Sequence, residues 1–178
     1  MKLCRYLILM VMVFSPLLLA EEASKPAFTV MFSDASAWNG NTVPQGQQCQ
    51  RFGGAPSTPA YVVENIPRGT YMLVFEYSDR NYPPMDNGGH GRVGFLVKES
   101  IKHVAVPSLP GHSFDLPEDF LLIAEHNGAG WDKAGAYMPP CSGGKGNEYY
   151  VTVKAVKKVK GHSKDKILAQ QVVELGRY

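Results

Sequence analysis

The chain has 178 residues, with 18 Lys and Arg against 16 Asp and Glu, and charged residues make up only 19% of it. A net charge of +2 is too small for a nucleic-acid-binding surface, which normally needs a clustered excess of Lys and Arg. The 44% of hydrophobic residues, with 18 Gly and 13 Pro, also exclude a coiled coil and a highly charged disordered chain. They favour one globular domain with many turns between short strands.

The first twenty residues have the features of an export signal. Lys2 and Arg5 provide a positive start, a nearly uninterrupted apolar run follows, and Ala20 suits cleavage by a signal peptidase. The run is short for a membrane span, although a retained N-terminal anchor is the alternative. We therefore predict a cleaved signal over 1–20 and a single mature domain over 21–178, periplasmic or secreted and without stable membrane insertion.

Removal of this segment changes the charge and the cysteine count. The mature chain keeps 16 basic and 16 acidic side chains, and it loses Cys4 but keeps Cys49 and Cys141. In an oxidising compartment the simplest interpretation of this pair is one disulfide, which would stabilise the fold by roughly 2–5 kcal/mol. Two separate buried thiols are the alternative. Neither cysteine has a His or Cys at metal-ligand spacing, which argues against a metal site.

Short runs rich in Val, Tyr, Phe, Ile and Leu predict strands along the mature chain, with Gly, Pro and Asn turns between them. In chain order the predicted strands are 27–32, 61–64, 71–77, 92–98, 120–124 and 148–159. Alternation is clearest from Tyr149 to Val156, where every second residue would face the core. The pattern is typical of an all-β dominated, antiparallel two-sheet β-sandwich.

One segment near the C-terminus is a helix candidate. Ser163 can cap a helix over 163–170, Asp165 would lie in its first turn, and Ile167 and Leu168 would supply an apolar contact. We therefore predict one short C-terminal helix beside the two sheets.

Asp79 and His90 are the residues best placed for chemistry. Asp79 lies at the exit of an apolar strand, and His90 precedes the next strand. A carboxylate beside an imidazole fixes its tautomer and prepares it to capture an anion such as phosphate or carboxylate. The Gly-rich segment 141–146 could add backbone N–H groups to the same pocket. The simpler alternative is that Asp79 caps a turn and His90 is an ordinary, half-exposed strand residue.

Catalytic signatures do not stand out in the sequence. The five histidines do not form a metal-binding pair, no serine lies in a nucleophile elbow, and the two mature cysteines lack CxxC spacing. We predict a non-enzymatic protein with neither metal nor cofactor.

Several segments occur in a characteristic order between residues 27 and 178. They are Ser57-Thr58-Pro59-Ala60, Glu64-Asn65-Ile66-Pro67-Arg68-Gly69-Thr70, the apolar strand ending at Asp79 and followed by Pro83 and His90, the loop from Asn127 through Tyr137 and Pro140-Cys141 to Gly146, and the ending Leu168-Ala169 to Gly176-Arg177-Tyr178. In order and spacing they resemble the phosphatidylethanolamine-binding protein family, especially its bacterial Raf-kinase-inhibitor-like branch, with this chain as a divergent member. The resemblance implies an antiparallel β-sandwich with a small cleft at one end, formed by the loops 79–90 and 137–147. It places Cys141 in the cleft loop, so a disulfide to Cys49 would hold the cleft wall.

The resemblance also implies a set of ligand-binding residues. They are Asp79, Asn81, Pro83, His90, Tyr137, Pro140 and Asn147. In the family's motifs an acid stands where Asn81 is, and a second histidine aligns with Asn147, or with Glu148 if the gap is moved. This cleft has therefore lost a carboxylate and an imidazole.

The implied function is an exported, non-enzymatic binding protein for a small anionic ligand or a phospholipid head group. Asp79 would orient His90, while His90 and Asn147 would donate hydrogen bonds to the anion. Tyr137 and Pro140 would pack against the apolar part of the ligand. The alternative is a protein–protein inhibitor or modulator that docks a protease or a host protein through the same cleft.

Overall fold

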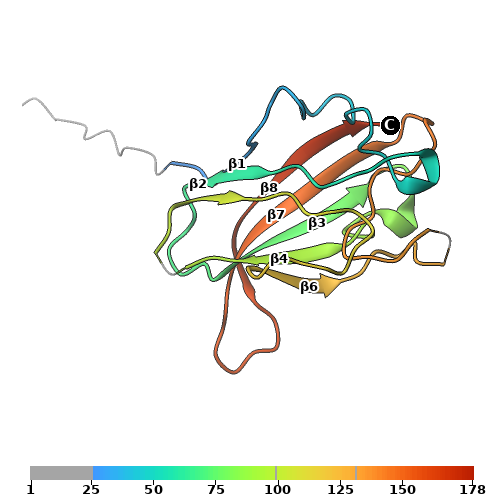
Figure 1. Cartoon of the computed structure of the whole chain (residues 1–178). Helices are drawn as coiled ribbons and strands as arrows, with labels where there is room; N and C mark the ends of the chain where they lie inside the picture. Colours follow the sequence, from blue (N-terminus) through green and yellow to red (C-terminus); the bar gives the residue numbers. More distant parts are fainter. Residues whose placement is uncertain (1–25, 99, 131) are drawn as a thin grey trace, which may run out of the picture.

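Two antiparallel sheets make up the fold (Figure 1). The computed structural model describes residues 26–98, 100–130 and 132–178, so the predicted signal over 1–20 lies outside the described residues. The smaller sheet has the order β1-β2-β5, with β1 at Thr29–Phe32, β2 at Tyr61–Glu64 and β5 at His103–Val106. The larger sheet has the order β6-β4-β3-β7-β8, with β3 at Met72–Asp79, β4 at Arg92–Leu96, β6 at Phe120–Ala124, β7 at Glu148–Lys157 and β8 at Lys166–Arg177.

The core lies between the two sheets and follows the period-two pattern of the sequence. In β7 the alternate residues Tyr149, Val151, Val153 and Ala155 are all buried in one hydrophobic cluster. The cluster includes the inward side chains of β2 and β3, whose aromatic rings meet where Tyr61 lies 5.3 Å from Phe75 between centroids. The alternation therefore positions the two sheets face to face, as predicted for a β-sandwich.

The prediction of a C-terminal helix over 163–170 is wrong. This region leads into β8, which pairs antiparallel with β7 along its length and places Val173 and Leu175 in the core. The residues Ser163, Asp165 and Ile167 fit a capped helix locally, but the long edge of β7 offers backbone hydrogen bonds that a short isolated helix cannot match. Helical structure in the described residues is limited to two short 3-10 turns, η1 at Gln50–Phe52 and η2 at Pro83–Met85.

The six predicted strands are confirmed, with small changes at their ends. The bounds of β2 and β6 match the predictions, whereas β3 continues to Asp79 and β7 ends at Lys157. The sequence did not predict β5, because His103–Val106 is a short segment. Its backbone hydrogen bonds to β2 hold it in an extended conformation.

Cys49 and Cys141 form a disulfide across 92 positions, which confirms the predicted pair over two separate thiols. The bond joins the segment that enters η1 to the loop that precedes β7. Within the three described ranges, no helix is long and apolar enough to cross a membrane.

Candidate functional site

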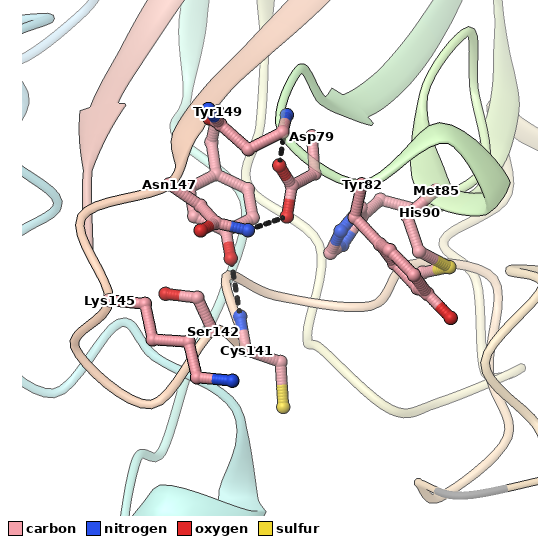
Figure 2. A pocket seen from close by; sticks show the side chains of 10 residues that line it. Asp79, Tyr82, Met85, His90, Cys141, Ser142, Lys145, Asn147 and Tyr149 are labelled. Carbon is pink, nitrogen blue, oxygen red and sulfur yellow. Dashed lines mark hydrogen bonds between the residues drawn. The ribbon is translucent and has the colours of Figure 1, made fainter.

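A cavity of about 440 Å³ opens at the end of the larger sheet, where β3 ends and β7 begins (Figure 2). It is lined by Asp79, Asn81, Tyr82, Met85, His90, Cys141, Ser142, Lys145, Asn147 and Tyr149. Asp79 and Tyr149 face each other in the β3–β7 register, so the sheet itself fixes the floor of the cavity. The loops on either side supply the walls.

The Asp79 carboxylate is buried and held by two hydrogen bonds. The backbone N–H of Asn81 donates to Oδ1 over 2.8 Å, and Asn147 Nδ2 donates to Oδ2 over 2.7 Å. Asn81 in turn accepts a bond from the backbone N–H of Glu148, over 2.7 Å. These bonds tie the end of β3 to the start of β7, and they leave the carboxylate with lone pairs for a ligand.

His90 is buried in the cavity lining and is held to Met138 by two hydrogen bonds. His90 Nδ1 lies 2.7 Å from the Met138 carbonyl oxygen, and the Met138 N–H donates to the His90 carbonyl over 2.8 Å. A carbonyl only accepts, so Nδ1 carries the proton and Nε2 is left as an acceptor. Burial lowers the pKa of His90 to about 4, against smaller opposing effects of the Met138 hydrogen bond and Asp79. The imidazole is therefore neutral near pH 7.

Gly91 allows these two hydrogen bonds to form. Its φ is +113°, and a Cβ at this position would lie 2.0 Å from the Ala136 carbonyl oxygen. Any side chain would therefore push the 136–138 segment away from His90. This explains why a glycine follows His90 in this chain.

The wall before β7 is built from the Gly-rich loop. The Cys141 N–H donates to the Tyr149 hydroxyl over 3.1 Å, and the Ser142 hydroxyl donates to the Tyr178 carbonyl at the end of the chain. Burial raises the pKa of Tyr149 to about 12, so the phenol is neutral. Lys145 is exposed and lies on the side of the cavity away from His90 (Figure 2).

The charges around the cavity are thus separated. Asp79 is a buried carboxylate, and Lys145 is an ammonium group at the rim, whereas His90 contributes no charge at neutral pH. The disulfide between Cys49 and Cys141 and the bond from the Cys49 N–H to the Pro140 carbonyl, 2.9 Å long, hold the rim loop to the body of the protein.

Comparison with known proteins gives the fold but no sequence relative. No family model matches the chain, and no curated protein matches it. Among solved structures, YbcL from Escherichia coli, described as a member of the mammalian phosphatidylethanolamine-binding protein family, is 18% identical with a TM-score of 0.55, covering 86% of this chain and 98% of YbcL. A phosphatidylethanolamine-binding protein homologue from Chlamydia trachomatis is 20% identical with a TM-score of 0.50, covering 85% of this chain and 97% of its own.

This is the phosphatidylethanolamine-binding protein fold. The fold expected from the sequence resemblance is confirmed, and the cavity of this phosphatidylethanolamine-binding-protein-like chain lies between the two loops that the resemblance indicates.

Four of the seven predicted ligand-binding residues line the cavity, namely Asp79, Asn81, His90 and Asn147. The Met138 carbonyl orients His90 in place of Asp79, because it accepts the bond from His90 Nδ1, while Asp79 accepts hydrogen bonds from Asn81 and Asn147.

The other three lie elsewhere. Pro83 is exposed at the start of η2, where the fixed φ of proline suits the first position of a helical turn. Tyr137 is buried in the core with its ring centroid 4.6 Å from that of Tyr77, so it cannot pack against a ligand. Pro140 is buried behind the rim, where its carbonyl accepts the Cys49 N–H.

Sequence reasoning missed several lining residues. They are the side chains of Tyr82, Met85, Ser142, Lys145 and Tyr149, whereas Cys141 was expected in the cleft loop as a disulfide partner. A usable signal existed for Tyr149, since it is the first inward residue of the alternating strand and follows the cleft loop directly. Lys145 was visible as the cation within the Gly-rich loop.

Proposed function

We propose that this chain is an exported, non-enzymatic binding protein whose cavity holds a small zwitterionic ligand of the phosphoethanolamine type, as in a phospholipid head group. The observation that carries the proposal is the charge separation across the cavity, with the Asp79 carboxylate at the buried end and Lys145 at the rim. A ligand with an ammonium group at one end and a phosphate at the other complements both.

The buried end favours a hydrogen-bond donor. Asp79 has remaining lone pairs, and His90 Nε2 accepts because Nδ1 donates to Met138. An ammonium group satisfies both acceptors, whereas an anion would meet a buried carboxylate and a neutral imidazole. This assigns His90 the opposite role from the donor that the family resemblance implies.

The rim favours the anionic part of the ligand. Lys145 donates charge-assisted hydrogen bonds, and the neutral Tyr149 phenol and the second Nδ2 hydrogen of Asn147 add uncharged donors. The Ser142 proton is already donated to the Tyr178 carbonyl, so Ser142 is expected to contribute little. Asn147 and Tyr149 lie beside Asp79 and Lys145 lies at the rim, so the donors extend from the buried end to the rim of a cavity large enough for a small head group.

Two further observations support a binding role outside the cytoplasm. The disulfide suits an oxidising compartment, in agreement with the predicted export signal. The cysteines that line or adjoin the cavity have no free thiol, because they are bonded to each other, so neither can act as a nucleophile.

Titration of the mature chain, residues 21–178, with phosphoethanolamine, inorganic phosphate and ethanolamine tests the proposal by NMR and calorimetry. We expect phosphoethanolamine to bind most tightly and to shift the amide signals of Asp79 and Asn147. Lys145→Gln should weaken phosphoethanolamine and phosphate by about tenfold, and Asp79→Asn should weaken phosphoethanolamine and ethanolamine by a similar factor, which is the loss of about 1.4 kcal/mol.

Lys102→Gln is the matched control, because Lys102 is exposed and lies in a different part of the surface. Equal affinity for phosphate and phosphoethanolamine would reduce the proposal to a simple anion site. The absence of any shift around the cavity at millimolar concentrations of all three probes would overturn it.

A further inference from the structure

The strand β6 forms one edge of the larger sheet (Figure 1). It exposes three consecutive apolar side chains. The exposed fractions are 44% for Leu121, 47% for Leu122 and 42% for Ile123. Natural edge strands usually carry a charged residue or a proline that prevents another strand from pairing, and Phe120–Ala124 has neither. Its pairing with β4 is interrupted only by one irregularity, between Leu122 and Ala124. This edge is distant in the sheet order from β7, whose start lines the cavity.

The backbone of β6 is oriented to accept another strand. The Leu96 N–H donates to the Asp119 carbonyl over 2.9 Å, which makes these two residues a hydrogen-bonded pair between β4 and β6. Bonded and non-bonded pairs alternate along an antiparallel ladder, so Leu121 bonds with Gly94, and Leu122, opposite Val93, turns its N–H and C=O away from β4. These groups face the open edge.

Side chains on both sides of β6 would contact an added strand. Leu122 lies on the core side, opposite the buried Val93, and Leu121 lies on the other face, opposite Gly94. On that face Gly94 leaves room for Ile123, whose Cδ1 would be 3.4 Å from a Cβ at Gly94. An extended segment with apolar residues could therefore pack on either face.

The chain segments that flank β6 are acidic, and the exposed Arg92 of the neighbouring strand β4 lies opposite Ala124. Residues 103–132 contain five acidic residues and no Lys or Arg. Glu118 and Asp119 directly precede the strand and Glu125 directly follows it, and all three are exposed. None of them takes part in an ion pair among the described residues. A complementary segment would carry basic residues on both sides of an apolar centre.

A second copy of the chain fits this edge poorly. Antiparallel pairing of two β6 strands would bring Glu118 and Asp119 of one copy close to Glu125 of the other. The opposite edge, β8, has basic ends but is bridged to β1, because Gln171 accepts from the Val30 N–H over 2.8 Å and donates to the Val30 carbonyl over 3.1 Å. From these constraints we propose that β6 is a docking edge for a partner protein, which adds an extended segment with an apolar centre and flanking Lys or Arg.

A peptide probe tests this directly. The mature protein is titrated with acetyl-Lys-Lys-Val-Thr-Val-Thr-Lys-Lys-amide, followed by NMR, with a second peptide in which glutamates replace all lysines. We expect saturable shifts along residues 120–124 with the lysine peptide and none with the glutamate peptide. Binding should weaken as the salt concentration rises.

Variants separate the contributions of backbone, side chain and charge. Leu122→Pro removes an outward N–H without removing a bond to β4, and Ile123→Lys adds the charge that most edge strands carry. Each should weaken the lysine peptide by about tenfold or more. The matched controls are Ile167→Lys and Val172→Lys on β8, which are 48% and 47% exposed and should leave the affinity unchanged. Glu118→Gln with Asp119→Asn should reduce both the affinity and its salt dependence.

Three results would overturn the proposal. The lysine peptide could fail to bind, it could bind the β6 and β8 variants equally, or the glutamate peptide could bind as well. Sedimentation of the protein alone provides a further check. Self-association that Ile123→Lys abolishes and Val172→Lys does not would assign the edge to a second copy instead of a partner.

Discussion

The cavity and the β6 edge belong to the same sheet but differ in how their polar groups are satisfied. Around the cavity, Asp79, Asn81, His90 and Asn147 already have hydrogen-bond partners within the protein. At β6 the outward groups of Leu122 point into solvent beside exposed apolar side chains. The first region is organised before a ligand arrives, whereas the second gains its hydrogen bonds only when another strand is added.

This difference has an energetic meaning. A pre-organised site loses little conformational freedom on binding, so a small ligand with few contacts can still bind. An open edge depends on many backbone bonds and apolar contacts formed together. Changes near the cavity should therefore affect stability and ligand binding jointly, while changes on β6 should affect partner binding and leave stability nearly unchanged.

Removal of the disulfide should give the largest difference between the two regions, because it should lower stability and ligand affinity at the cavity but leave peptide binding at β6 unchanged. The double variant Cys49→Ala with Cys141→Ala loses a cross-link over 92 positions, and we expect the free energy of unfolding to fall by about 2–5 kcal/mol. The rim loop would lose its attachment, so phosphoethanolamine affinity should fall as well. Denaturant unfolding and calorimetry measure the two effects. Unchanged stability would show that the loop is held by its hydrogen bonds alone, and unchanged peptide binding at β6 is the internal control.

A lower pH should have the second-largest effect and should destabilise the cavity region. Burial lowers the pKa of His90 from 6.5 in a model peptide to about 4 in the fold, so the unfolded chain binds a proton more readily. The stabilising contribution of neutral His90 is thus complete above pH 6.5 and is lost as the pH falls toward 4. The linkage amounts to about 3 kcal/mol over this window. Burial also lowers the pKa of His126, which adds in the same direction.

The matched variant is His90→Asn, because the asparagine amide can donate to the Met138 carbonyl in place of Nδ1 without titrating. Its unfolding free energy should change less between pH 7 and pH 4 than that of the natural chain. Urea unfolding at a series of pH values gives the two slopes, and equal slopes would contradict the assignment. NMR titration of the His90 ring measures its pKa independently.

The smallest predicted effect concerns Tyr137, which lies behind the cavity wall in the core. Its buried hydroxyl has no hydrogen-bond partner among the described residues, and leaving such a group unpaired is unfavourable. We expect Tyr137→Phe to raise the unfolding free energy by about 1 kcal/mol and to leave phosphoethanolamine affinity unchanged, because the side chain does not line the cavity. Loss of ligand affinity in this variant would show that Tyr137 contributes to ligand binding, contrary to its assignment to the core.

Much of the β architecture followed from the sequence. The runs at 61–64 and 120–124 have the composition of strands and flanking turns, and the alternation from Tyr149 to Val156 predicted that β7 has one packed face. The cysteine pair followed from counting after removal of the predicted signal. These features are local or depend on composition, so no neighbouring strand is needed to recognise them.

The site was predictable only in part. Asp79, Asn81, His90 and Asn147 could be placed at one end of the sandwich from the order of their motifs. The hydrogen-bond partner of His90 could not be predicted from the sequence. It is the backbone carbonyl of a residue 48 positions away, and every residue has a carbonyl. The neutral state of His90 follows from burial, which only the packed structure supplies.

The sequence by itself determined the short strands, the turns between them, the cysteine pair and the loops that meet at the cavity, because these depend on nearby residue types. The tertiary structure decided that residues 166–177 form a strand, that Tyr137 belongs to the core, and that Lys145 and Asp79 line the same cavity. It also decided which strand remains at an open edge. These outcomes depend on pairing and burial between distant segments, and no local pattern specifies which segments will meet.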